Sequence, residues 1–223
     1  MKKAVLAVAV VSAFAVPAFA ETNLNPFEDS KSGFYLGLGL GAADYDDSYS
    51  TAKDFYNEVG ASGTLKYTTR DAAWKVFGGY RVNKYFGVEA SYNNLGNPDA
   101  DFYPSNGRSI VETEAEIKGY GLKAIGYYPI NNSFELLASV GALKWEVEEE
   151  TKGTSFVTGR SAKFKSKTEK GTSLTVGLGA NYNLTDNIAF GLQWERINDV
   201  GDKKLAFGET DIDTYTLSAQ YKF

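Results

Sequence analysis

The sequence contains no cysteine and no histidine. Without cysteine there is no disulfide framework and no thiolate chemistry. Without histidine the chain lacks the side chain that most often acts as a general acid or base, and as a metal ligand, near neutral pH. Serines are present, but no recognisable base motif accompanies them. We therefore predict that the protein is not an enzyme and that it has no catalytic, metal or cofactor site.

Long apolar runs are lacking after the N-terminus, which excludes a helical membrane protein. The first 20 residues, MKKAVLAVAVVSAFAVPAFA, place Lys2 and Lys3 before an apolar run that closes on Ala18-Phe19-Ala20. This pattern is typical of a secretory leader, and the run is shorter than the roughly 20 residues of a membrane-spanning helix. We predict that residues 1–20 are a signal peptide, cleaved after Sec-dependent export, and that residues 21–223 form one domain.

An excess of positive charge is missing too. The chain has 23 basic and 28 acidic residues, which give a formal net charge of −5. Nucleic acid carries dense negative charge and is bound mainly through basic side chains. We therefore predict no nucleic-acid partner.

Two-residue alternation of apolar with small or polar residues recurs along the chain, which is the pattern of strands with unlike faces. The 15 tyrosines, 14 phenylalanines and 23 glycines also favour sheet over helix. We expect eight strands, at Gly33 to Ala43, Ala73 to Val82, Gly87 to Leu95, Ile117 to Ile130, Ser133 to Val147, Thr172 to Leu184, Ile188 to Ile197 and Ile212 to Phe223.

Alternation alone fits both a soluble sandwich and a membrane barrel, but the connector lengths favour the barrel. The links after odd-numbered strands are long, and those after even-numbered strands are tight turns. An outer-membrane barrel sorts its connectors in this way, with short periplasmic turns and longer external loops. The long links are Asp44 to Ala72, Gly96 to Glu116, Glu148 to Gly171 and Asn198 to Asp211, and the turns are centred on Asn83 to Phe86, Asn131-Asn132 and Thr185 to Asn187.

Aromatic residues collect at both ends of the expected strands, as in the two girdles that flank the apolar band of a membrane barrel. The girdle towards the long links would contain Trp74, Tyr92, Trp145, Trp194 and Tyr215, and the girdle towards the turns Tyr85, Phe86, Tyr128, Phe134, Tyr182 and Phe223. An even strand count brings the first strand beside the last, and this closure removes the unpaired edge that lipid cannot hydrate.

Four segments carry a family resemblance: FGGYRVNKYFGVEASYNNLG from Phe77, GYYPINNSFELLASVGALKW from Gly126, IAFGLQWERINDVGD from Ile188, and the terminal LSAQYKF. In their order and spacing the chain resembles the N-terminal transmembrane domain of the OmpA family. The resemblance implies an all-β fold, an eight-stranded antiparallel barrel that spans the outer membrane of a Gram-negative cell among its lipids. Full-length family members continue into a peptidoglycan-binding domain, whereas nothing follows Phe223 here, so cell-wall tethering is not expected.

The resemblance also implies delivery by periplasmic chaperones to the barrel-assembly machinery. That machinery is thought to recognise a last strand that ends in Phe, with apolar residues at alternating earlier positions. The matching residues are Tyr215, Leu217, Ala219, Tyr221 and Phe223. We expect them to form the assembly signal.

The phase of the alternation points a set of charged residues into the barrel. An eight-stranded lumen is narrow, so these charges should be paired. In the family, similar interior charges form salt bridges that block the bore, and exchange of partners has been invoked to explain small conductance. The network is either such a gate or a fixed polar plug, and we expect it to contain Lys75, Arg81, Glu89, Lys123, Glu135 and Glu195, with Gln193 beside them.

The third long link combines the acidic WEVEEE with the basic SAKFKSKTEK. Their alternation predicts that this hairpin projects beyond the membrane with opposite charges across it. Its basic residues either contact lipopolysaccharide phosphates or are simply solvated. Two functions remain: a structural role in envelope integrity, with at most a narrow pore for ions and small solutes, or surface recognition through the long loops in adhesion, host or phage contact.

Overall fold

The computed structural model describes residues 32–46, 63–105, 109–202 and 209–223. The predicted signal peptide and most of the first long link lie outside these ranges. Ten strands are present in the described residues: β1 (Gly33–Tyr45), β2 (Gly63–Tyr67), β3 (Arg70–Arg81), β4 (Phe86–Asn94), β5 (Asp99–Pro104), β6 (Ser109–Pro129), β7 (Phe134–Ser155), β8 (Ser161–Asn183), β9 (Ile188–Gly201) and β10 (Glu209–Lys222). No helix in the described part of the chain is long and apolar enough to cross a membrane.

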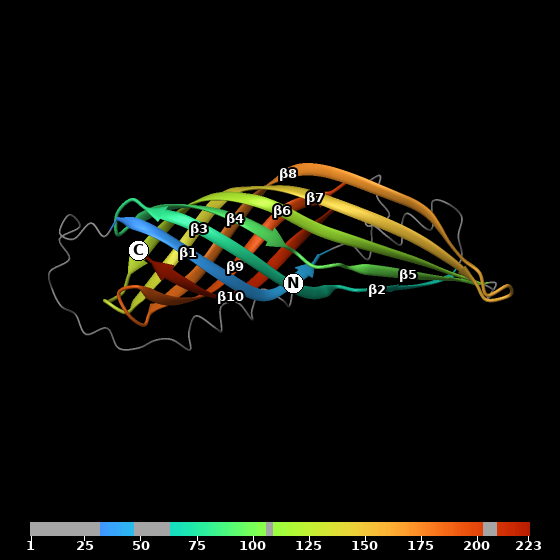
Figure 1. The fold of residues 1–223 in the computed structure, drawn as a ribbon, viewed down its shortest axis with the longest axis horizontal. Coiled ribbons are helices and arrows are strands. Elements are labelled where there is room, and N and C mark those ends of the chain that lie inside the picture. The colour runs from blue at the N-terminus through green and yellow to red at the C-terminus, as the bar shows by residue number, and fades with distance from the viewer. Residues whose placement is uncertain (1–31, 47–62, 106–108, 203–208) are drawn as a thin grey trace.

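Eight of the strands close into an antiparallel barrel in the order β1-β10-β9-β8-β7-β6-β4-β3 (Figure 1). The first and last strands pair over eleven positions, from Tyr35 opposite Lys222 to Tyr45 opposite Ile212. Pairing of β6 with β7 joins the two halves of the sheet, so no barrel strand is left with a free edge along the wall. The predicted all-β, eight-stranded antiparallel barrel is confirmed.

Three turns of one design close the end of the barrel that we call the turn end. In the β3–β4 turn the side-chain oxygen of Asn83 accepts hydrogen bonds from the backbone N–H groups of Tyr85 and Phe86, at 2.8 and 2.9 Å. Asn131 repeats this arrangement in the β6–β7 turn, and the Thr185 hydroxyl does so in the β8–β9 turn. Such side chains replace a backbone acceptor in a tight turn, which is why each turn needs only a few residues.

The outer wall of the barrel carries the apolar side chains. Leu38, Leu122, Leu178 and Leu217 are between 59% and 66% exposed, although each lies in the middle of a strand. Aromatic rings border this band at both heights, with Trp74, Tyr92 and Tyr120 in contact at one end and Phe134 against Tyr182 at the other. This band is the surface that an outer-membrane barrel presents to lipid.

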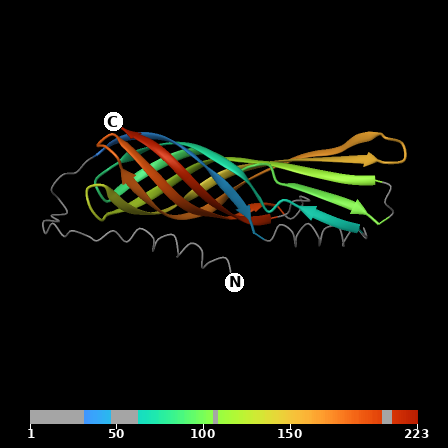
Figure 2. The same ribbon diagram turned by 90° about the horizontal axis from the view of Figure 1, so that it is seen from below.

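Three strands continue far past the barrel and form, with β2 and β5, a projection that we call the extension (Figures 1 and 2). The pairing order there is β2-β5-β6-β7-β8. Much of the second and third long links is therefore strand rather than loop, which corrects the expected boundaries of β6, β7 and β8. The predicted projecting hairpin is confirmed, since Glu146 lies opposite Lys170 and Glu149 opposite Lys167.

Candidate functional site

A buried ion-pair layer crosses the middle of the lumen. Glu89 on β4 lies opposite Lys123 on β6, because these two strands pair in that register. The Lys123 ammonium lies 3.2 Å from Glu89 Oε1 and 2.8 Å from Glu195 Oε2, which reaches in from β9. Lys123 and Glu89 are each only 6% exposed. Two carboxylates thus share one cation inside the barrel, where desolvated charges have to be paired.

A second cation balances this layer. Lys75 on β3 is 7% exposed, and its ammonium donates to the Gln193 side-chain oxygen at 2.5 Å. The same oxygen lies 3.5 Å from the Lys123 ammonium. Gln193 therefore bridges the two lysines, and the group holds two cations and two carboxylates in a connected set.

A lower layer near the turn end is built around Arg81. Its guanidinium forms a two-pronged pair with Glu135, at 2.7 and 3.1 Å, and donates to the backbone carbonyls of Asn83 and Lys84. Asn181 donates to the same Glu135 carboxylate at 3.1 Å. The guanidinium also lies 4.0 Å from the centre of the Tyr127 ring. A bidentate pair with further partners on both sides is a strong and geometrically fixed contact.

Tyr35 connects the two layers. Its hydroxyl donates to Glu89 Oε2 at 3.0 Å and lies 3.3 Å from the Tyr127 hydroxyl. All six predicted network residues therefore lie inside the barrel, in two groups that Tyr35 and Tyr127 join. Sequence reasoning missed Tyr35, Tyr127 and Asn181, although each occupies an inward position of its strand. Whether the network gates or only fills the lumen stays a prediction.

The lumen changes character towards the extension. Here the inward side chains are apolar and form one buried cluster, which includes Ile117, Leu143, Trp145, Val147, Ile197 and Ile212. Trp145 was predicted in the outer aromatic girdle, and this is wrong. It is only 5% exposed, and its indole N–H donates to the Ser173 hydroxyl at 2.8 Å. The inward phase of β7 places it inside, whatever its height along the strand.

The five residues of the predicted assembly signal all face outward on β10 or just after it. Tyr215, Leu217, Tyr221 and Phe223 are between 41% and 74% exposed, and Ala219 lies exposed between them. Tyr221 and Phe223 contact each other with ring centres 5.1 Å apart. Their role in assembly stays a prediction.

The outer face of the extension is charged. Lys170 pairs with Glu146 and Lys163 with Glu150, each at 2.8 Å, and Lys118 lies 3.5 Å from Glu148. The hydrogen bond from Lys163 holds the pKa of Glu150 below its ordinary value, and that from Lys170 does the same for the pKa of Glu146. Because Lys118, Lys163 and Lys170 already have carboxylate partners, contact of the basic residues with lipopolysaccharide phosphates stays a prediction.

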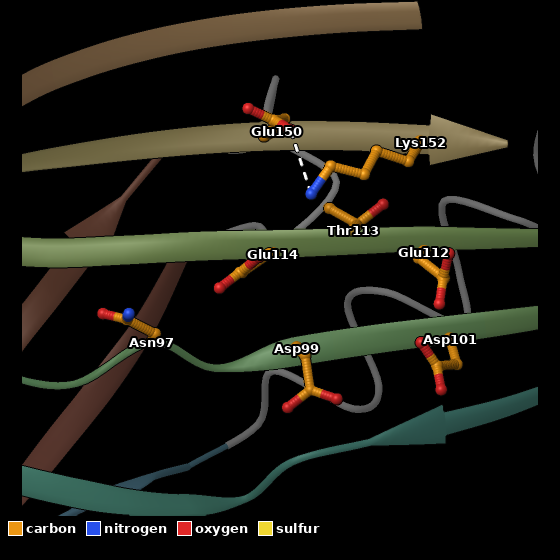
Figure 3. Close-up of a pocket in the computed structure, with 8 residues that line it drawn as sticks. All are labelled: Asn97, Asp99, Asp101, Glu112, Thr113, Glu114, Glu150 and Lys152. Carbon is orange, nitrogen blue, oxygen red and sulfur yellow. Dashed lines mark ion pairs between the residues drawn. The ribbon is translucent and has the colours of Figure 1, made fainter. Parts of the chain in front are cut away.

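Next to these pairs lies an acidic hollow of about 370 Å³ on strands β5, β6 and β7 (Figure 3). Its carboxylates come in cross-strand pairs, Asp99 opposite Glu114 and Asp101 opposite Glu112. In the described part of the chain no group of three or more His, Cys, Asp or Glu residues is arranged to hold a metal ion. The hollow is a charged surface, and the absence of an enzymatic site stays a prediction.

Comparison with known proteins gives consistent matches. A family model described as outer membrane protein beta-barrel domain matches residues 6–223. Outer membrane protein A of Serratia marcescens is 28% identical over 224 residues, which cover 100% of this chain and 56% of that protein. Outer membrane protein A of Escherichia fergusonii is 29% identical over 227 residues, with the same two coverages of 100% and 56%. The chain spans about half the length of these curated relatives.

Among solved structures, the Neisserial surface protein NspA is 14% identical, with a TM-score of 0.49 over 86% of this chain and 99% of that chain. OprG of Pseudomonas aeruginosa is 17% identical, with a TM-score of 0.48 over 86% of this chain and 96% of that chain.

Proposed function

Because the chain belongs to the family of outer membrane protein β-barrel domains, we propose that its work in the outer membrane is structural, supporting the integrity of the envelope. The observation that carries this proposal is the filled interior. Two layers of hydrogen-bonded charges tie β1, β3, β4, β6, β7, β8 and β9 together across the lumen. A barrel braced in this way favours a rigid membrane element over an open channel.

The structural role is tested in a strain that lacks the gene. We expect the strain to become more sensitive to detergent and chelator, and the full chain to restore resistance. A second complementing chain, with the projecting hairpin shortened by removal of residues 151–168, should restore resistance equally, because the hairpin lies outside the barrel wall. A deletion strain as resistant as its parent would refute the structural role.

The same lumen supports a narrow pathway for ions as a secondary activity. A second lysine lies beside the cation that Glu89 and Glu195 share, since one Gln193 side-chain oxygen accepts from both Lys75 and Lys123. Recording from the refolded chain in planar bilayers tests this pathway. Discrete conductance steps are expected, and their complete absence at every voltage would leave only the structural role.

A second candidate function is surface recognition, and the extension favours it. From Trp145 to Ser155, strand β7 runs about 30 Å at ~3.3 Å per residue, which carries the hairpin tip well away from the barrel rim. At that tip Phe156 and Val157 are 57% and 71% exposed. Residues 151–168 contain five basic and no acidic residues. An exposed apolar tip with a basic flank is suited to a partner with complementary surface chemistry.

Recognition is tested on whole cells with two paired variants. Phe156→Ser with Val157→Ser removes the apolar tip and leaves the basic flank, whereas Lys163→Gln with Lys167→Gln does the reverse. Adhesion to host cells and adsorption of phage are measured at equal surface expression. We expect at least one of the two variants to lose adhesion or phage adsorption. If both variants adhere and adsorb phage as well as the parent does, surface recognition by the hairpin is refuted.

A further inference from the structure

We infer that an apolar seal closes the extension end of the lumen, and that this seal, rather than the ion pairs beneath it, is the main barrier to ions. The inference rests on the proposed ion pathway and concerns the residues that limit it. The seal is the buried apolar cluster of the upper lumen. Its members are at most 8% exposed, and they are Ala43, Tyr45, Ala73, Leu95, Ala115, Ile117, Leu143, Trp145, Val147, Ile197, Val200 and Ile212.

The seal spans the whole bore. Its side chains come from β1, β3, β6, β7, β9 and β10, and from Leu95 directly after β4. Strand β8 completes the circle with Gly171, which lies opposite Trp145 and packs against its ring. A Cβ atom added at Gly171 would lie 2.3 Å from Trp145 Cζ2, so no space separates this wall from the indole. A layer with contributions from every side leaves no gap along one wall for water to follow.

Polar groups within the seal find their partners inside it. The Trp145 N–H donates to the Ser173 hydroxyl, which in turn donates to the Asp199 carbonyl at 2.9 Å. The Tyr45 hydroxyl donates to the Leu95 carbonyl at 2.5 Å. Buried polar groups that are satisfied by the protein do not require water, so the layer is stable without hydration.

A small cavity lies where the charged layer meets the seal. It holds about 10 Å³, and its lining includes Lys75 and Glu195 of the charged layer, Leu95 and Ile197 of the seal, and polar side chains such as Thr214. This volume is at the lower limit for a single water molecule. An ion that passes from the charged layer to the seal through this cavity would therefore keep few of its waters.

The two layers oppose ions by different physical means. The ion-pair layer offers charges and hydrogen-bonding groups that can replace part of a hydration shell. The seal has no charge, and the polar groups of Tyr45, Trp145 and Ser173 are already hydrogen-bonded within the protein, so a bare charge in this constriction keeps most of its desolvation cost. Exchange of partners between Glu89, Lys123 and Glu195 leaves the seal unchanged. Opening the ion pairs alone should therefore not open the bore.

Conductance of the refolded full chain in planar bilayers separates the two barriers. Leu143→Ala with Trp145→Ala thins the seal, and Glu89→Gln with Lys123→Gln neutralises the central pair. Lys144→Ala is the matched control, because Lys144 lies between the two seal residues but faces outward. We expect the seal variant to conduct at least tenfold more than the wild type, and the other two variants to stay within about twofold. The seal is refuted if the charge variant gains as much, or if the seal variant gains nothing while it migrates as a folded barrel.

Thiol labelling provides a measurement that depends neither on conductance nor on a variant that loses two large side chains. The chain has no cysteine, so a single introduced thiol reports alone. Ile117 is 0% exposed and Val157 is 71% exposed. We expect a charged, membrane-impermeant thiol reagent to modify Ile117→Cys at least 100-fold more slowly than Val157→Cys. Equal rates would overturn the seal. Detergent resistance is also measured in the strain that carries Ile117→Cys, and unchanged resistance would show that the structural role survives.

Discussion

Strands β6, β7 and β8 run through both the barrel wall and the extension, yet the two regions place different chemistry on the two faces of these strands. In the barrel half of β7 the outward residues are apolar, and one of them, Val140, is 53% exposed. The inward residues of this half include the buried Glu135. In the extension half Glu146, Glu148 and Glu150 face outward, whereas Trp145, Val147 and a single carboxylate, Glu149, face inward and are buried. The strand phase does not shift from Glu135 to Glu150.

The height at which the two faces of β7 change their residue types shows that the surrounding medium determines which residue type suits each face. On the turn-end side of the aromatic girdle formed by Trp74, Tyr92 and Tyr120, acyl chains contact the outer wall and charges are confined to the lumen. On the extension side of this girdle, water solvates the outer face, so charged pairs lie outside and the inward face can be packed with apolar residues. The seal is thus an apolar layer inside the mouth of the barrel, at the height where the wall begins to be solvated by water.

The largest effect should come from removing a shared cation in the lumen. Lys123→Met leaves Glu89 and Glu195 buried without their common partner. Breaking a buried ion pair by removing one member costs about 3 to 5 kcal/mol. We expect that loss in the free energy of unfolding, measured by urea titration in lipid vesicles with tryptophan fluorescence.

The same substitution on the other face of the wall is the control. Lys144→Met alters an exposed residue of β7 at the rim. Surface changes of this kind usually stay within about 0.5 kcal/mol. Equal losses at the two positions would mean that the lumen is hydrated enough to solvate the unpaired carboxylates.

The next effect concerns the outer wall along one strand. Leu178 and Thr168 both face outward on β8, but Leu178 lies in the apolar band and Thr168 lies in the extension. An arginine at the bilayer midplane costs about 2 to 4 kcal/mol in membrane barrels. We expect that loss for Leu178→Arg and almost none for Thr168→Arg. Similar losses for both would place the boundary between the two regions elsewhere.

Much of this architecture follows from two-residue periodicity. Alternation predicted eight strands and placed Lys75, Glu89, Lys123 and Glu195 on inward positions, because side-chain direction in a strand depends only on parity. The resemblance to the OmpA family is confirmed by the family match over residues 6–223. Localisation in the outer membrane of a Gram-negative cell follows from the same match and from the relatives.

What sequence reasoning could not supply is the height at which each strand leaves the membrane. Segments such as VETEAE in β6 alternate as regularly as the membrane-spanning part, but both of their faces differ from the lipid pattern and they were interpreted as loop. Trp145 was assigned from its residue type, which favours an interface, whereas its parity put it inside. Tyr35 was missed because the register of three different strands brings its hydroxyl to Glu89 and Tyr127.

A smaller effect should distinguish the two regions by packing density. Gly171 faces the indole of Trp145, and a Cβ there would lie 2.3 Å from Trp145 Cζ2. At Gly126 the nearest atom to an added Cβ would be the Ala138 carbonyl oxygen, at 3.8 Å. Overpacking costs about 1 to 3 kcal/mol. We expect Gly171→Ala to lose that much unfolding free energy and Gly126→Ala to lose almost none, and two equal changes would indicate that the seal is loosely packed.

The smallest effect is a pH dependence confined to the extension. The hydrogen bond from Lys163 lowers the pKa of Glu150 from its ordinary value of 4.5, so the folded extension favours the ionised carboxylate. Its contribution to stability is therefore complete above pH 4.5 and is lost as the pH falls through the lowered folded pKa. We expect amide hydrogen exchange in residues 146–170, corrected for intrinsic rates, to accelerate a few-fold on acidification, while the barrel amides of β10 stay unchanged. In Glu150→Gln this pH response should shrink, and a response of unchanged size would assign it to other carboxylates of the extension.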